Sequence, residues 1–165
     1  MATNNAINQI GVLPSFSAYS AADQSLVTGD ATVYPIVFPD ILYNRTSSFD
    51  GTSTFTAPLT GTYIFNVGVY FNGFTALNVT VESTLSLVTT GKTYLLEFWG
   101  ESSGQYSPPI ALGGTRSQIC HLTVGDTVQV TLTVSQNGAK SITILGKAGA
   151  VFYTPIFSGY MIAGI

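Results

Sequence analysis

Charged residues are scarce in this chain of 165 residues. Asp, Glu, Lys and Arg make up 8% of the sequence, whereas soluble domains contain about 25%. The hydrophobic fraction is 45% and the mean hydropathy is +0.36, so apolar surface is left to cover. Because obligate interfaces are depleted in charge, we predict that the chain associates with copies of itself. The alternative is a surface kept soluble by uncharged polar residues alone.

Clustered positive charge is also lacking. The net charge is −3, and the five basic residues are scattered along the chain: Arg45, Lys92, Arg116, Lys140 and Lys147. Proteins that bind nucleic acid present a basic patch or stripe to the phosphates. The composition therefore argues against a nucleic-acid partner.

Cysteine, histidine and long apolar runs are nearly absent. Cys120 is the single cysteine, so no disulfide can form within the chain, and we interpret it as a small core residue. No stretch reaches the ~18 apolar residues of a membrane-spanning helix. Met1 to Gly11 lacks the apolar run of a signal peptide. We expect no membrane insertion, and display outside a cell would depend on another segment or a carrier particle.

The main pattern present is alternation of apolar and polar residues. Three segments carry it, with the apolar sets Tyr63, Phe65, Val67, Val69, Phe71; Leu77, Val79, Val81, Leu85, Leu87; and Val128, Val130, Leu132, Val134. A period of two is typical of strands with one buried face. No window has helical spacing, and glycine-containing turns separate the runs. We predict an all-β fold, a jelly-roll sandwich of about ten antiparallel strands.

No linker or block of charge divides the chain. Residues 1–11 are polar, and we expect them to form a flexible arm or the remnant of a stalk. Residues 12–165 then form one domain, which is an ordinary domain length. The longest unpatterned region is Gly100 to Gly114, which we predict to be an exposed loop.

The segment FDGTSTFTAPLTGTYIF, residues 49–65, resembles the signature of C1q-like domains in the C1q and tumour necrosis factor superfamily. Further matches lie upstream at Asn44, downstream at the Gly-Asp pair, and in the Phe-Ser-Gly-aromatic end of the chain. The matching residues are Asn44, Phe49, Asp50, Phe55, Pro58, Gly61, Tyr63, Phe65, Gly125, Asp126, Phe157 and Gly159. These positions determine a fold, so the resemblance implies a C1q/TNF-like architecture and names no chemistry.

The resemblance also implies assembly and function. It implies a homotrimer whose axis is faced by strands around Thr62 to Phe71 and Ile156 to Ile165. Ala57 replaces the family's usual cysteine, and the chain is most similar in character to heads of phage, viral or bacterial fibres. The implied function is a non-catalytic trimeric head that binds a host receptor or surface glycan, outside a cell or on a virion. A structural trimerisation cap or virion or spore decoration protein, and a secreted C1q-like recognition module, are the alternatives.

No catalytic pattern accompanies the fold signature. The lone histidine, His121, has no Asp or Ser at a suggestive spacing, and the sequence lacks both a Gly-x-Ser-x-Gly elbow and a phosphate-binding loop. We therefore expect no enzyme and no cofactor. Calcium stays an open alternative, with loop acids such as Asp30 or Asp40 as oxygen ligands, although no Asp-x-Asp-x-Asp loop supports it.

Aromatic and acidic residues around the single tryptophan are the candidate ligand contacts: Trp99, Tyr106, Tyr94, Glu97 and Glu101. Alternation puts Tyr94, Leu96 and Phe98 on one strand face. It puts Leu95, Glu97 and Trp99 on the other face, which we predict to be the wetter one. An exposed tryptophan beside carboxylates suits sugars or peptides. The alternative is that Trp99 packs against a neighbouring subunit.

Overall fold

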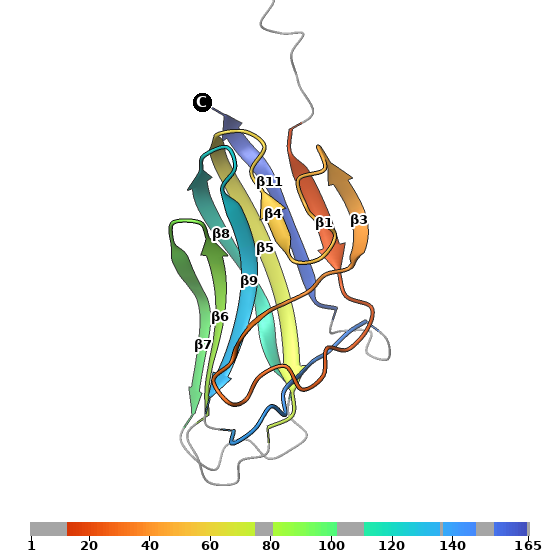
Figure 1. Cartoon of the computed structure of the whole chain (residues 1–165), viewed down its shortest axis with the longest axis vertical. Coiled ribbons are helices and arrows are strands. Elements are labelled where there is room, and N and C mark those ends of the chain that lie inside the picture. The colour runs from red at the N-terminus through yellow and green to blue at the C-terminus, as the bar shows by residue number, and fades with distance from the viewer. Residues whose placement is uncertain (1–12, 75–80, 102–110, 136, 148–153, 165) are drawn as a thin grey trace, which may run out of the picture.

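The computed structural model describes residues 13–74, 81–101, 111–135, 137–147 and 154–164, with the side chain of Glu101 outside the description. Within these ranges the chain forms eleven β-strands, close to the number predicted. The strands form two antiparallel sheets that pack face to face (Figure 1). The described residues include no helix long and apolar enough to cross a membrane. The predicted all-β sandwich is confirmed.

The first sheet, sheet A, contains six strands in which β5 is central. From one edge to the other its main order is β3, β1, β11, β5 and β8, and β10 pairs with the last residues of β5. The strands are β1 (Ser15–Tyr19), β3 (Asp40–Arg45), β5 (Gly61–Asn72), β8 (Leu112–Leu122), β10 (Thr143–Ile144) and β11 (Ile156–Gly164). Figure 1 shows the start of β1 and the end of β11 at the same end of the sandwich.

The second sheet, sheet B, contains five strands. Its order is β2, β9, β6 and β7, and β4 pairs with the beginning of β9 on the side where β2 pairs with its end. The strands are β2 (Val33–Pro35), β4 (Thr54–Thr56), β6 (Val81–Thr89), β7 (Thr93–Glu101) and β9 (Thr127–Ser135). Strands β7 and β8 are therefore edge strands of different sheets, and they lie beside each other.

The core lies between the sheets and is built from the alternating residues that the sequence predicted. The alternating apolar residues predicted in β5 and β9, from Tyr63 to Phe71 and from Val128 to Val134, are all buried, as are Val81, Leu85 and Leu87 of the third alternating segment. At one end a cluster of phenylalanines fills the space between the sheets. The ring centroids of Phe16 and Phe49 are 4.9 Å apart, and those of Phe16 and Phe157 are 4.8 Å apart. Both distances are favourable for aromatic pairs.

Several signature residues hold turns. Asp50 Oδ1 accepts hydrogen bonds from the backbone N–H groups of Thr52, Ser53 and Thr54, at 2.7, 2.9 and 3.0 Å. Partial burial of the carboxylate acts to raise the pKa of Asp50, but these hydrogen bonds outweigh it and the pKa is lowered. Local hydrogen bonding therefore explains why an aspartate occupies the turn after β3.

Gly159 permits the close approach of strand β11 to the phenylalanine cluster. A Cβ at this position would lie 2.5 Å from a ring carbon of Phe65 and 3.0 Å from one of Phe16. Gly125, between β8 and β9, instead serves a turn, since its φ is +90°. Both signature glycines are therefore required by the backbone and its packing.

One sequence expectation, the extent of the predicted loop, needs correction at its boundaries. Gly100 and Glu101 belong to β7, and 112–114 belong to β8. Both ends of the predicted loop are therefore paired strand residues. Its middle, 102–110, and the predicted arm, 1–11, lie outside the described residues. In the apolar C-terminal end, Met161 is buried in the subunit core whereas Ile162 is 47% exposed.

Candidate functional site

The candidate ligand residues come from β7, where a β-bulge changes which side chains face the core. Leu85 of β6 lies opposite Glu97, and its neighbour Ser86 lies opposite Leu95, so Leu96 is an extra residue. A bulge reverses the alternation beyond it. The predicted faces are therefore wrong in part: Phe98 is exposed at 51%, and Trp99 packs against the core.

Trp99 occupies the inner side of β7. Its ring lies 5.3 Å from that of Phe71, at an interplanar angle of 72°. It also lies opposite Ser83 of β6, which is fully buried and whose Oγ has no hydrogen-bond partner among the described residues. The tryptophan therefore fills the end of its own subunit's core and offers no free stacking platform on the outer face.

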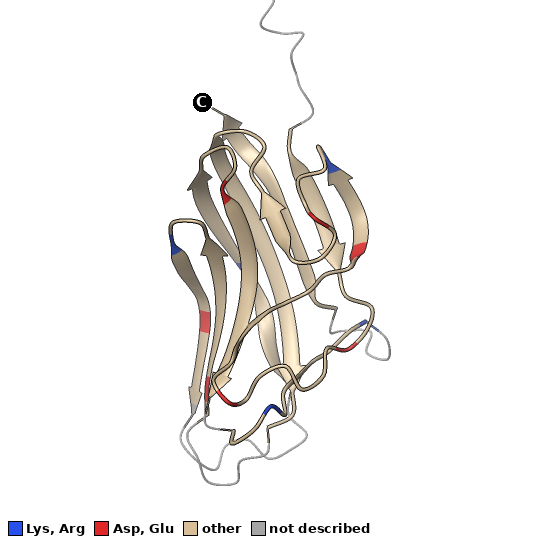
Figure 2. Ribbon diagram, in the orientation of Figure 1, with Lys and Arg blue, Asp and Glu red and all other residues tan. Residues whose placement is uncertain are grey.

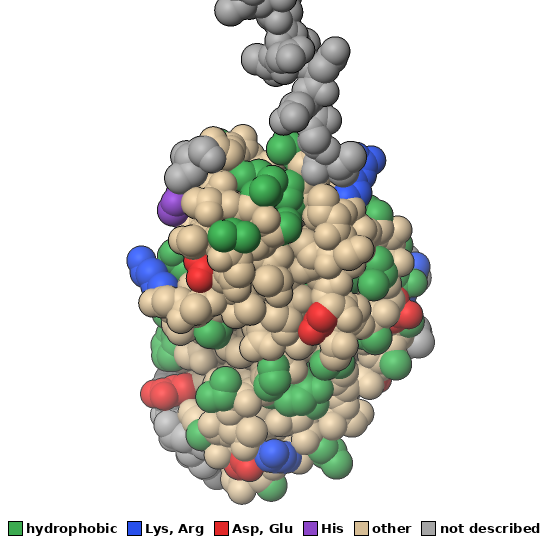
Figure 3. All heavy atoms as spheres, turned by 45° about the horizontal axis from the view of Figure 1, so that its top comes forward, with side chains coloured by type: hydrophobic (Ala, Val, Ile, Leu, Met, Phe, Trp, Pro, Cys, Tyr) green, Lys and Arg blue, Asp and Glu red, His purple; other side chains and the backbone are tan. Residues whose placement is uncertain are grey.

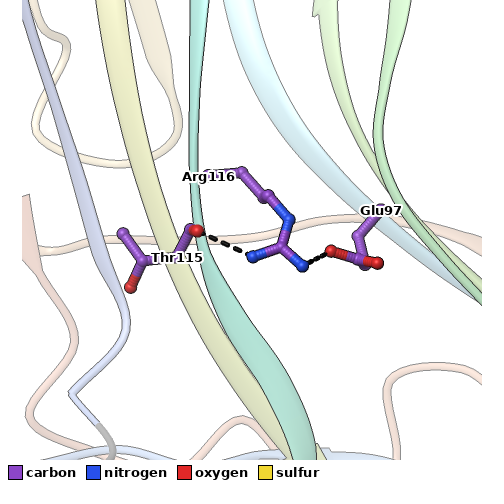
Figure 4. Close-up of polar contacts among 3 residues, drawn as sticks. All are labelled: Glu97, Thr115 and Arg116. Carbon is purple, nitrogen blue, oxygen red and sulfur yellow. Dashed lines mark hydrogen bonds and ion pairs between the residues drawn. The ribbon is translucent and has the colours of Figure 1, made fainter.

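An ion pair joins the two sheets where β7 and β8 meet. The Arg116 guanidinium lies between the carboxylate of Glu97, with which it pairs, and the backbone oxygen of Thr115, to which Nη1 donates at 2.9 Å (Figure 4). The Arg116 side chain is 44% exposed and that of Glu97 is 21% exposed. We call this place, with Tyr94, Glu97, Trp99, Arg116 and Cys120, the β7–β8 seam. The carboxylate of Glu97 is thus engaged inside the subunit.

The other end of the seam holds a buried thiol. Burial raises the pKa of Cys120, and a hydrogen bond with Tyr94 opposes this effect. Burial also raises the pKa of Tyr94, and the neighbouring Cys120 raises it further. Lys92 Nζ lies 4.7 Å from the centre of the tyrosine ring. Cys120 is 1% exposed, which confirms its predicted place in the core. A protonated, buried thiol is a poor nucleophile.

The structure thus brings three of the five predicted ligand-contact residues together. They lie at the β7–β8 seam, with their side chains directed toward their own subunit and not toward the outer face. They are Tyr94, Glu97 and Trp99. Tyr106 lies outside the described residues, and of Glu101 only the backbone, in β7, is described. Binding of a ligand by this cluster stays a prediction.

The aspartates named for calcium are engaged in local hydrogen bonds. Asp40 Oδ2 accepts from the backbone N–H of Ala21 at 2.8 Å. Asp30 Oδ1 accepts from the backbone N–H of Thr32 at 3.1 Å, and hydrogen bonding from Thr32 lowers the pKa of this exposed carboxyl. In the described part of the chain no three His, Cys, Asp or Glu side chains gather in a group that could hold a metal ion.

The outer side of sheet A forms a broad surface, of which the sequence had indicated only the strands. It has no charged residue on β1, β5 or β11, and charge appears at its β3 edge, where Arg45 and Asp40 lie opposite Ser15 and Tyr19. Strand pairing orders its side chains into rows that run across the sheet. One row contains Ile119, Ile64, Tyr160 and Ser15, on β8, β5, β11 and β1. Ile119 and Tyr160 are 54% and 44% exposed. We call this surface the sheet A face.

A second apolar pair lies on the outer side of sheet B. Leu95 and Phe98, on the two sides of the bulge in β7, are 60% and 51% exposed. Their neighbours on β6 are Ser86 and Thr84. We call these four residues the β7 patch. The sheet A face and the β7 patch therefore lie on two different sides of the sandwich.

Charge is sparse over the described surface. Charged residues lie mainly in turns and near strand ends (Figure 2), and strands β1, β5 and β11 contain none. On the face drawn in Figure 3, charged side chains stand apart among uncharged polar surface, and hydrophobic side chains form several patches. The low charge of the composition is therefore a property of whole surfaces of the sandwich.

Comparison with known proteins agrees with this architecture. A family model described as C1q domain matches residues 18–162. The globular domain of zebrafish complement 1qA is 19% identical with a TM-score of 0.60, and the match covers 92% of this chain and 99% of that chain. Murine APRIL at pH 5.0 is 14% identical with a TM-score of 0.55, and the match covers 91% and 99%.

Among curated protein sequences, the search finds no match. Identities of this size show a shared fold, and they confirm the predicted C1q/TNF-like jelly roll. The family model spans most of the chain, including the signature from Asn44 to Phe65 and most of the last strand. The chain therefore belongs to the C1q domain family.

Proposed function

We propose that this chain is the trimeric, non-catalytic head domain of a fibre or surface protein that binds a receptor or surface glycan. C1q/TNF domains are typically trimeric, generally non-enzymatic recognition modules, and they are usually extracellular or secreted. Membership of the family supports the general form of the proposal. A fibre of a phage, virus or bacterium is the more specific form, suggested by the character of the sequence.

The observation that carries the proposal is the apolar, charge-poor sheet A face. It exposes large apolar side chains, including Ile119 and Tyr160, and three of its strands, β1, β5 and β11, contain no charged residue. Contiguous apolar surface of this kind typically marks a protein–protein interface. A second copy of the chain is the simplest cover, because obligate interfaces between copies are apolar and poor in charge.

Three copies need two different surfaces on each chain. In a closed ring of three, the contact is heterologous, so one patch of each copy meets a different patch of the next. The β7 patch supplies the second surface, since Leu95 and Phe98 are exposed on another side of the sandwich. We propose that the β7 edge of one copy packs on the sheet A face of the next.

Light scattering on size exclusion tests the assembly. The expected mass is three times the 17.4 kDa of one chain. The double variant Ile119→Ser/Tyr160→Ser should be a folded monomer. The control is Val33→Ser on β2, which removes an apolar side chain that is 61% exposed outside both surfaces. A parent protein that is a monomer would contradict the proposal.

Binding is tested with the intact trimer on a glycan array and on candidate host cells. A trimer that binds should lose most of its apparent affinity when the double variant makes it monomeric, because three linked sites act together. A trimer that binds neither glycans nor cells would instead support the structural cap or decoration protein. The identity of the adjoining protein segment, a fibre stalk or a collagen-like repeat, separates a fibre head from a secreted recognition module.

A further inference from the structure

A row of small polar residues crosses the centre of the sheet A face. Ser117, Asn66, Ser158 and Ser17 lie directly opposite one another on the adjacent strands β8, β5, β11 and β1. We call these four residues the polar row. On one side of it lies the row of Ile119, Ile64, Tyr160 and Ser15, and on the other lies the row of Thr115, Gly68, Ile156 and Tyr19. The polar row thus runs between neighbours that include large apolar and aromatic side chains.

The polar row has hydrogen-bonding capacity left over. Ser117 Oγ donates to Asn66 Oδ1 at 2.6 Å. For the hydroxyls of Ser17 and Ser158, and for Asn66 Nδ2, no hydrogen bond is found among the described residues. Ser17 is only 6% exposed even in the single chain. When another surface covers the row, each of these groups must find a partner or lose its hydration, which is costly.

The chain itself offers a surface of matching pattern. In the β7 patch, the apolar residues Leu95 and Phe98 lie directly opposite the hydroxyl residues Ser86 and Thr84. On β9, the next strand, Thr131 and Thr133 continue the polar side. An apolar edge backed by hydroxyl groups complements an apolar row beside a polar row. Neither the β7 patch nor the polar row contains a charged residue that would favour a charged partner. A second copy of this chain is therefore the occupant that the chemistry favours.

Polar groups within an apolar interface select one arrangement. A shift of the neighbour along the strands would bring apolar side chains over Asn66, Ser158 and Ser17 and leave them without partners. Single buried polar residues set register and the number of chains in coiled coils by this same penalty, at some cost in stability. We propose that the polar row fixes the register and the number of copies in the assembly. The inference rests on the proposed function, because it requires association through the sheet A face.

The test replaces two members of the row by a residue suited to strands. Asn66→Val/Ser158→Val should fold, since valine favours strands and both side chains point outward. We expect its melting temperature to stay equal or rise, while light scattering loses the single peak at three times the chain mass and shows a mixture of assemblies. Asn66→Thr/Ser158→Thr, which leaves a polar hydroxyl group at each position, should remain one trimer. Thr115→Val, a single substitution of a polar residue by valine on the same face outside the row, should also remain one trimer.

The outcomes separate the inference from the proposed function. If the parent is a trimer and the valine variant is the same uniform trimer, the inference is overturned and the proposed assembly stands. If Thr115→Val disperses the assembly equally, the row has no special role and the inference is likewise overturned. If the parent is a monomer, the proposed function fails before any variant is compared. The inference is supported if the parent and the threonine variant each form a single trimer while the valine variant forms a mixture of assemblies.

Discussion

The side chain of Asn44 forms two hydrogen bonds with the backbone of Phe49. Nδ2 donates to the Phe49 oxygen at 2.7 Å, and the Phe49 N–H donates to Oδ1 at 3.2 Å. The two bonds close the turn after β3, in which Thr46 and Ser47 have positive φ values of 69° and 50°. One amide side chain thus holds a strained turn and positions a phenylalanine of the core cluster.

We expect Asn44→Ala to lower the free energy of unfolding by about 1–3 kcal/mol, because two backbone groups lose their partner. Urea denaturation measures the change. Asn44→Asp retains the acceptor at Oδ1, but it places a carboxylate oxygen against the Phe49 carbonyl oxygen, so it should be destabilised as well. An alanine variant as stable as the parent would show that the turn needs no side-chain support.

Phe157→Ala should cost about 3–5 kcal/mol of folding stability, since deleting a buried ring leaves a cavity. Phe157 is fully buried and contacts the rings of Phe16 and Phe38. The matched control is Phe98→Ala, the same change at a residue that is 51% exposed. Both should be measured in the Ile119→Ser/Tyr160→Ser variant, so that assembly does not contribute. Equal losses at the two positions would contradict the placement of β11.

The stability contributed by the charge of Asp50 should disappear in acid. Its pKa is lowered in the folded state from an ordinary value of 3.8, so the charge stabilises the fold above that value. The contribution is lost as the pH falls through the folded pKa. We therefore expect Asp50→Asn to be less stable than the parent at neutral pH, with the difference closing below pH 3.8. Urea midpoints across this range measure it, and a constant difference would rule the mechanism out.

The ion pair between Glu97 and Arg116 should contribute modestly, because both side chains reach solvent. A double-mutant cycle with Glu97→Gln and Arg116→Met should give a coupling energy of up to about 1 kcal/mol that weakens in concentrated salt. The mass of the proposed trimer should persist at the same salt concentration, because few charges are available to screen. Dissociation of the trimer in salt would contradict a mainly apolar interface.

Cys120 should resist thiol reagents in the folded protein. Its thiol is buried beside Tyr94, and burial raises its pKa, so little thiolate is available or accessible. A chromogenic disulfide reagent should react only at the rate of unfolding and then fully in denaturant. Prompt reaction of the native protein would mean that the β7–β8 seam opens in solution.

Strand faces could be predicted from the sequence wherever alternation is unbroken. In β5 and β9 the alternating apolar residues, such as Phe65 and Leu132, face the core because backbone geometry alone gives a period of two. In β7 the same reasoning failed beyond Leu96, since the bulge arises from pairing with β6 and leaves no mark in the local pattern. The burial of Trp99 and the exposure of Phe98 follow from that single extra residue.

The candidate surfaces also divide into features that the sequence predicts and features that only the tertiary structure creates. Low charge, turn residues and the C1q signature are properties of the chain itself, and they determined the fold class, the family and the expectation of self-association. Only the tertiary structure paired Glu97 with Arg116 and aligned Ser117, Asn66, Ser158 and Ser17. These residues come from different strands, and their meeting depends on register and sheet order. Both are decided by the packing of the whole core, which no local spacing contains.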